Sequence, residues 1–221
     1  MDIGSAFTFA FDDQDWIKKL AIGGVILLFA VPLSIVLVGL ALFLPVFGYM
    51  LEVIKNVRDG QPTPLPEWDD FGSLFSKGLM VFVIVLAYNI PAILVACASA
   101  GVNLGVDQVD SDVAGSLAFA VICLNCVQVI LSIGASLLFP AGIIRYARQD
   151  TLAAAFQFRE IFKLIRENIG DYVIAVLLSW VAGLVAGLGI IICGIGIFFT
   201  YFWSLLVSAN LYGQFARKAG A

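Results

Sequence analysis

Two cysteines stand at a spacing that thiol chemistry uses. Cys123 and Cys126 form a C-x-x-C pattern, which serves redox pairs and some metal sites, but the chain has no His, the commonest metal ligand. The pattern lies inside a long apolar stretch, where small polarizable side chains fit well between membrane helices. We therefore expect both cysteines to serve helix packing, and we predict no metal site and no cofactor. A redox role for the pair is the alternative.

Four polar side chains inside apolar stretches form a second candidate site. They are Tyr88, Asn89, Asn125 and Gln128. Uncharged amides inside a bilayer usually form hydrogen bonds across a helix interface, and Pro91 frees a backbone carbonyl that a neighbour must satisfy. Helix contact is one interpretation of these residues, and a polar intramembrane pore or solute site is the other.

Charged side chains are absent from the middle of every apolar stretch. Because buried ionisable residues mark proton relays and ion pathways, we predict neither a pump nor a proton-coupled transporter. We find no paired carboxylates, no Ser/His/Asp set and no phosphate-binding loop, so we predict no enzyme and no catalytic residue. We expect Glu52 to pair with Lys55 at i,i+3 spacing. The Gly183-x-x-x-Gly187 pattern predicts a helix contact.

The elements that position these groups are membrane helices, because 62% of the residues are hydrophobic and only 13% are charged. All 12 Lys and Arg residues border apolar stretches, always on the same alternate borders, whereas the loop around residues 98–113 has Asp107, Asp110 and Asp112 and no cation. Cytoplasmic loops of membrane proteins are enriched in Lys and Arg. We therefore predict a multi-pass protein with both termini on the cytoplasmic side.

Four apolar stretches set the number of crossings, at residues 20–51, 78–106, 113–144 and 172–212. A crossing needs about 20 residues, so the first and last stretches are too long for one helix each. Matching charges at both borders of the first stretch favour a hairpin that turns between Ser34 and Gly39, aided by Pro32. We expect the last stretch to divide near residues 190–196, where glycines gather. We predict an all-α polytopic membrane protein with six membrane segments; four spans is the alternative.

The three hairpins suggest a threefold internal repeat within a single membrane domain over residues 1–221. Its units would be residues 1–58, 59–148 and 149–221. Each unit begins with an aromatic, charged stretch that ends in Gly and finishes with a helix that has a basic end. A general likeness among membrane hairpins explains the pattern equally well, and both explanations stay open.

Two linkers on the basic side are long enough to have structure. Residues 61–70 form a proline-rich strap, for which we single out Pro64, Pro66, Trp68 and Asp69 as interface residues. We expect Trp68 at the lipid headgroups and Asp69 or Asp70 as the N-cap of the next helix. Residues 151–168 predict an amphipathic helix, with a second near residues 3–11. Such helices lie in the membrane interface or form a docking surface for a cytoplasmic partner.

The order of these features resembles DUF4013, a family of uncharacterised prokaryotic membrane proteins. Its most specific elements here are Gly48-Tyr49 and Pro64-Leu-Pro-Glu-Trp68, preceded by a D-x-x-D-W-x-x-K-L start at residues 12–20. The resemblance implies an integral protein of the prokaryotic inner (cytoplasmic) membrane, and supplies no activity and no site residues.

We predict a non-enzymatic accessory subunit or self-associating scaffold of a membrane complex. The alternative is a passive transporter or channel for a neutral or lipid-like solute. The expected partners are membrane lipids and either further copies of the chain or other membrane-protein subunits. We predict no nucleic-acid binding, because carboxylates nearly balance the cations on the basic side.

Overall fold

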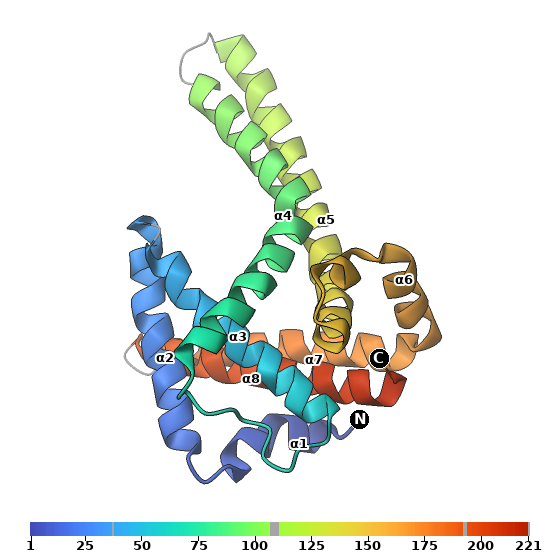
Figure 1. Ribbon diagram of the computed structural model, residues 1–221. Helices are drawn as coiled ribbons and strands as arrows, with labels where there is room; N and C mark the ends of the chain where they lie inside the picture. The colour runs from blue at the N-terminus through green and yellow to red at the C-terminus, as the bar shows by residue number, and fades with distance from the viewer. Residues whose placement is uncertain (37, 107–110, 192–193, 221) are drawn as a thin grey trace. The chain divides into compact units, whose positions relative to one another are not determined.

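The computed structural model describes residues 1–36, 38–106, 111–191 and 194–220, and within these ranges the chain is helical with no β-strand (Figure 1). The predicted all-α class is therefore confirmed. The helices form two compact units. The first unit is Met1–Val83 with Pro140–Ala221, and the second unit is Ile84–Phe139. The single membrane domain and the three repeat units stay predictions.

Eight α-helices follow one another along the described chain. They are α1 (Ile3–Thr8), α2 (Trp16–Leu33), α3 (Val38–Arg58), α4 (Phe71–Val106), α5 (Ser111–Gln149), α6 (Phe158–Glu167), α7 (Ile169–Gly187) and α8 (Gly196–Ala219). Short 3-10 turns lie at Phe9–Asp12, Ser34–Val36, Leu152–Phe156 and Leu188–Ile191.

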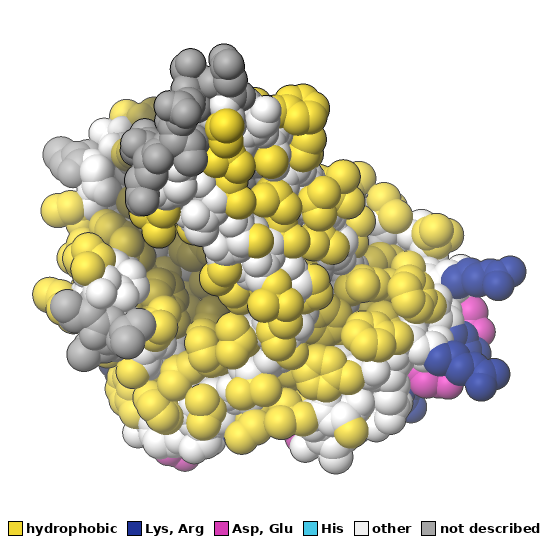
Figure 2. Space-filling view, turned by 90° about the horizontal axis from the view of Figure 1, so that it is seen from above, with side chains coloured by type: hydrophobic (Ala, Val, Ile, Leu, Met, Phe, Trp, Pro, Cys, Tyr) yellow, Lys and Arg dark blue, Asp and Glu magenta, His cyan; other side chains and the backbone are white. Residues whose placement is uncertain are grey.

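Five helices of the described chain are long and apolar enough to cross a membrane. They are α2, α3, α4, α5, and α7 with its following turn. Hydrophobic side chains cover most of the surface seen in Figure 2, as expected for a chain whose solvent is lipid. These features indicate a membrane protein.

The first long apolar stretch divides where the sequence predicts. Helix α2 ends at Leu33, directly after Pro32, and α3 begins at Val38. The two helices pack against each other. Gly39 makes the tight return feasible, because a Cβ at this position would overlap the carbonyl oxygen of Ala30.

The last apolar stretch also divides at its predicted place. Helix α7 ends at Gly187, a 3-10 turn follows, and α8 begins at Gly196. Gly194 has φ +71°, in the left-handed region that favours glycine. α7 and α8 then lie side by side (Figure 1).

Helix α8 is the central element of the first unit. It contacts α1, α2, α3 and α7, and nearly every residue from 202 to 216 is buried or half-buried. Gly23 and Gly24 of α2 leave room for the rings of Phe202 and Phe199, which a Cβ at either glycine would overlap. A helix that is buried on all sides belongs in the core of a fold.

Helices α3 and α4 approach each other closely within the first unit. A Cβ at Gly48 would overlap the carbonyl of Leu74, and a Cβ at Gly78 would overlap the carbonyl of Leu44. The two glycines therefore let each backbone touch the other, as small residues commonly do between membrane helices.

The second unit is an antiparallel hairpin of residues 84–106 of α4 and 111–139 of α5. The second and third apolar stretches are each one helix, which continues through its proline, Pro91 in α4 and Pro140 in α5.

The linker at residues 151–168 differs from the single amphipathic helix that the sequence predicts. It forms a 3-10 turn and then α6, which begins only at Phe158. The apolar residues of α6 do not share one environment: Ile161 and Leu164 are buried in the first unit, whereas Phe158 and Phe162 are exposed. Packing against the first unit requires only one narrow side of this short helix.

Candidate functional site

A buried ammonium group joins three separate segments of the first unit. Lys19 is only 4% exposed. Its Nζ lies 2.8 Å from Asp13 Oδ2, 2.6 Å from Glu67 Oε1 and 3.2 Å from the carbonyl oxygen of Leu65. An ammonium group has three donors, so these three acceptors satisfy it completely. Lys19 thereby connects the start of the chain, α2 and the strap.

Aromatic rings cover this ionic cluster. Trp68 of the strap stacks on Tyr49 with ring centroids 4.3 Å apart, and Phe202 lies 5.6 Å from Tyr49 and 5.9 Å from Trp68. The indole Nε1 of Trp68 donates a hydrogen bond to the carbonyl of Lys19 at 3.1 Å. The Tyr49 hydroxyl is buried with no hydrogen-bond partner among the residues that the structure describes.

The prediction that Trp68 lies at the lipid headgroups is wrong. The side chain is 5% exposed, and its N–H is satisfied inside the protein. The strap folds back over α2 and α3. There Tyr49 provides a ring for stacking and Lys19 a carbonyl acceptor, so the indole needs neither lipid nor headgroup contacts.

The rest of the strap is held by its backbone and its cap. Asn56 Nδ2 donates to the carbonyl of Pro64 at 2.9 Å, while Pro66 is half-buried and Asp69 is exposed. Asp70 Oδ1 accepts a hydrogen bond from the Ser73 N–H at 2.9 Å. Of the two predicted candidates, Asp70 is therefore the residue that caps α4.

The basic helix ends of the first unit are connected to one another. Lys55 of α3 pairs with Asp150, and Arg58 Nη1 donates to the carbonyl of Ala147 at 2.7 Å. Lys218 of α8 pairs with Asp171 of α7 at 2.7 Å. The ends of α3 and α5, and those of α7 and α8, are thus joined in pairs.

Two further contacts belong to the same group of helix ends. Arg148 Nη1 donates to the carbonyl of Gly220 at 2.7 Å, which connects α5 with the end of α8. Arg58 also binds the carboxylate of the exposed Asp59, and these hydrogen bonds lower the pKa of Asp59 below its ordinary value.

The predicted pair of Glu52 with Lys55 is wrong. Glu52 lies 3.1 Å from Lys77 of α4, and Lys55 pairs with Asp150. The close approach at Gly48 and Gly78 brings Lys77 beside α3. Glu52 therefore pairs with a cation of the neighbouring helix and not with the one at i,i+3 on its own helix.

The structure does not bring the four intramembrane polar residues together. Asn125 accepts a hydrogen bond from Ser99 Oγ at 3.0 Å across the hairpin of the second unit. Asn89 Nδ2 donates at 2.8 Å to the carbonyl of Val85 in its own helix, beside the half-buried Tyr88. Ser99 and Asn89 are ten residues apart on α4, or ~15 Å, so the two amide levels are well separated.

Asn125 and Gln128 do share one feature, a shallow hollow along α5 of about 530 Å³. Its remaining lining comprises Val129, Ser132, Ile133 and Ser136. Cys123 and Cys126 are exposed free thiols on the same helix, and Cys193 lies outside the described residues. No group of three His, Cys, Asp or Glu residues in the described ranges is placed to hold a metal ion.

The ionic cluster is the site that sequence reasoning missed. In the sequence, Lys18 and Lys19 are two neighbouring cations at the border of an apolar stretch. Nothing in the local pattern indicates that Lys19 is buried and Lys18 is exposed. The signal lies in the segments instead: the stretch around Trp16–Lys19, the Gly48-Tyr49 pair and the Pro64-Leu-Pro-Glu-Trp68 strap meet at this one place. The segments that carry the family resemblance are thus the ones that the cluster joins.

Comparison with known proteins matches most of the chain to a protein family. A family described as "Protein of unknown function (DUF4013)" matches residues 17–195, which include the ionic cluster's Lys19 and Glu67. No curated protein and no solved structure matches the chain.

Proposed function

Because this chain belongs to the DUF4013 family, whose function is unknown, we propose a function from its own geometry. The protein is a non-enzymatic structural component of the prokaryotic inner membrane, either a self-associating scaffold or an accessory subunit of a larger complex. The observation that carries this proposal is a helix-contact surface on α7 that the rest of the described chain leaves open.

Helix α7 has two sides lined by small residues. Ser179, Ala182 and Ala186 are buried on the side of α8. Gly183 and Gly187 are exposed, and a Cβ at either position would meet no atom within 4 Å. The helix contact predicted from Gly183-x-x-x-Gly187 is therefore not made by the described residues of this chain. In lipid, such a groove lets a second helix approach its backbone closely, which favours a partner in another molecule.

We further propose six membrane segments, α8 included, with both termini on the cytoplasmic side. The contacts that join the basic C-terminal ends of α3, α5 and α8 with one another and with the start of α7 support a common side for them. A threefold repeat is part of this proposal, supported by the succession of three helix pairs along the chain, α2–α3, α4–α5 and α7–α8.

The assembly state of the purified protein tests the proposed function. We expect native mass spectrometry in mild detergent to show a defined homo-oligomer or a stoichiometric protein partner. Gly183→Leu fills the groove and should weaken that assembly at least tenfold. Gly101→Leu is a matched control, because Gly101 is also exposed with nothing within 4 Å. A wild-type protein that is monomeric, partnerless and active on a small molecule would contradict the proposal.

The hollow along α5 favours one second candidate, a passive transporter or channel for a neutral or lipid-like solute. Its polar lining in an otherwise apolar hairpin offers hydrogen bonds to an uncharged molecule. The test is solute flux into liposomes with Asn125→Leu, and with Asn89→Leu as the comparison on the other amide level. Unaltered flux in both variants would exclude these amides as a solute site.

A further inference from the structure

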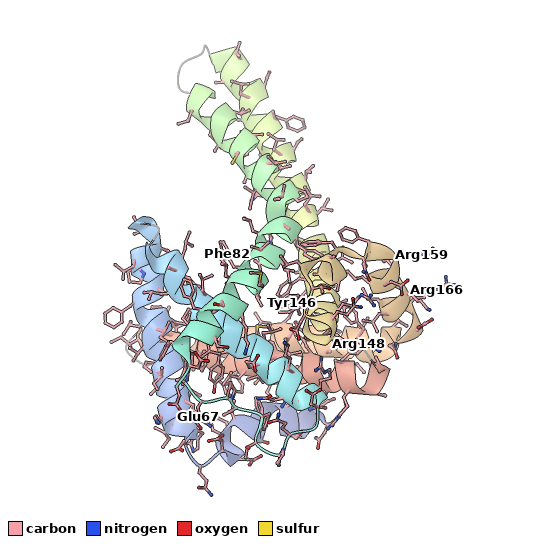
Figure 3. All side chains as sticks on the ribbon, viewed as in Figure 1. Glu67, Phe82, Tyr146, Arg148, Arg159 and Arg166 are labelled. Atoms are coloured by element: carbon pink, nitrogen blue, oxygen red, sulfur yellow. The ribbon has the colours of Figure 1, made fainter. Side chains whose placement is uncertain are left out.

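Helix α6 presents a ridge of positive charge to its surroundings. Arg159, Lys163 and Arg166 are all exposed, and their i, i+4, i+7 spacing places them along one line of the helix. Figure 3 shows Arg159 and Arg166 on the outer side of α6, directed away from the rest of the first unit. A surface hollow of about 470 Å³ runs beside all three.

The protein does not neutralise this ridge. Among the described residues, no carboxylate lies within ion-pair distance of Arg159, Lys163 or Arg166. The cations elsewhere in the first unit that do have carboxylate partners are Lys19, Lys55, Arg58, Lys77 and Lys218. The ridge is thus available to an anion from outside the chain.

The two flanks of the ridge differ in chemistry. At 100° per residue, Phe158 and Phe162 fall on one side of the ridge, and Glu160 and Glu167 fall on the other. The two phenylalanines are 47% and 57% exposed. Around the helix the order is therefore buried side, exposed aromatic rings, cations, carboxylates. Rings on one flank and carboxylates on the other suit a boundary between acyl chains and water.

The position of α6 in the chain fits such a boundary. It ends at Glu167, and the candidate membrane span Ile169–Ile191 begins two residues later. A guanidinium group binds phosphate oxygens through two parallel hydrogen bonds, and Lys adds a point charge. The cytoplasmic leaflet supplies such phosphates together with a negative surface potential.

We propose that the Arg159–Lys163–Arg166 ridge binds the phosphate groups of anionic phospholipids, with Phe158 and Phe162 inserted at the level of the upper acyl chains. This inference rests on the cytoplasmic placement of α6 in the proposed topology. It does not depend on self-association or on the groove of α7.

The test uses the full-length protein in nanodiscs that contain phosphatidylcholine with one-fifth phosphatidylglycerol. The amount of phosphatidylglycerol that stays bound after transfer to mild detergent is measured by native mass spectrometry. Each cation near an anionic surface contributes about fivefold in binding, so the triple variant Arg159→Gln, Lys163→Gln, Arg166→Gln should lose about 100-fold. Binding to the wild type should also weaken as salt rises.

Matched variants separate charge from fold. Lys18→Gln removes another exposed cation, one that belongs to α2 and lies outside the ridge, and should leave lipid binding unchanged. Arg159→Lys with Arg166→Lys keeps the charge and should retain most of the binding. Should the triple variant fail to fold, the three single variants replace it, each with an expected loss of about fivefold.

Three results would overturn the proposal. The first is equal phosphatidylglycerol enrichment in the wild type and in the folded Gln variants of the ridge. The second is displacement of the lipid by millimolar inorganic phosphate, which would make the ridge a site for a small free anion. The third is a protein bound to the ridge with no preference for phosphatidylglycerol. A monomeric wild type that still selects phosphatidylglycerol would contradict the proposed scaffold and leave this inference intact.

Discussion

Lys19 keeps its charge in an almost closed site because three oxygen atoms surround its ammonium group. Removal of a charge from water costs several kcal/mol, and only close partners offset that cost. Here the partners come from segments far apart in the sequence. Glu67 and the carbonyl of Leu65 thus hold the strap to α2 through this one ammonium group.

The first prediction concerns this ammonium group. Lys19→Met should leave the buried Asp13 without its cation and destabilise the protein by about 3 kcal/mol. Thermal unfolding in mild detergent measures the effect. Lys18→Met changes the exposed neighbour and should alter stability by less than about 0.5 kcal/mol. Equal melting temperatures for the two variants would show that the cluster does not stabilise the fold.

The second prediction concerns the unsatisfied hydroxyl of Tyr49. Tyr49→Phe keeps the stack on Trp68 and removes a buried polar group that has no partner in the described chain, so the protein should become more stable by about 1 kcal/mol. Trp68→Phe is the counterpart, because it removes a hydrogen bond that is made and should cost about 1 kcal/mol or more. Destabilisation by Tyr49→Phe would reveal a bond partner outside this chain, such as a bound lipid.

At the scale of helices, close backbone contact defines the first unit. Gly48 of α3 and Gly78 of α4 lie at the contact between these two helices. A Cβ at either position would overlap a backbone carbonyl oxygen of the other helix. The consequence reaches the charges as well, because the same approach brings Lys77 to Glu52.

The third prediction compares two glycines by their surroundings. Gly78→Ala should force α3 and α4 apart and lower stability by 2 kcal/mol or more, about the cost of overpacking a core. Gly115→Ala has open space around the new methyl group and should be neutral or stabilising by about 0.5–1 kcal/mol, because alanine favours helix over glycine. Unfolding in a denaturing detergent series measures both. A neutral Gly78→Ala would mean that the two helices lie farther apart than described.

The helix boundaries follow from local chemistry and could be predicted from the sequence. Pro32 ends α2, glycines divide α7 from α8, and Asp70 caps α4, since each acts within a few residues of itself. The linker at residues 151–168 was harder. The α-helix begins only at Phe158, and the residues before it form a 3-10 turn. Amphipathic spacing alone does not distinguish such a turn from the first turns of an α-helix.

At the scale of the whole molecule, the fourth prediction tests the proposed crossings. In a background without the native cysteines, Asp59→Cys and Gln149→Cys should react with an impermeant maleimide only from the cytoplasmic side. Val113→Cys should react only from the opposite side. All three positions are exposed. Reaction of Asp59→Cys from outside would mean that the first hairpin does not return, which would leave four spans as the better topology.

The contacts between distant segments could not be predicted from the sequence. Nothing near Lys19 in the sequence marks it as the buried member of a Lys-Lys pair. The sequence around Trp68 is typical of a membrane-interface residue, and only the folded strap places its ring on Tyr49. The central position of α8 is a similar case. Its polar residues Asn210 and Gln214 suggest a helix end near water, yet both are buried, and Gln214 binds the backbone of Asp2.

The central position of α8 also delays the completion of the fold during synthesis. Helix α3 ends at Arg58 and its partner α8 begins only at Gly196. At a synthesis rate of about 5–20 residues per second, the α2–α3 hairpin waits roughly 7–28 s for the helix whose rings pack on Gly23 and Gly24. During that delay, the surface of α2 and α3 that packs against α8 in the finished protein has no partner helix. Slower synthesis would lengthen the time for which this surface is open to other proteins of the membrane.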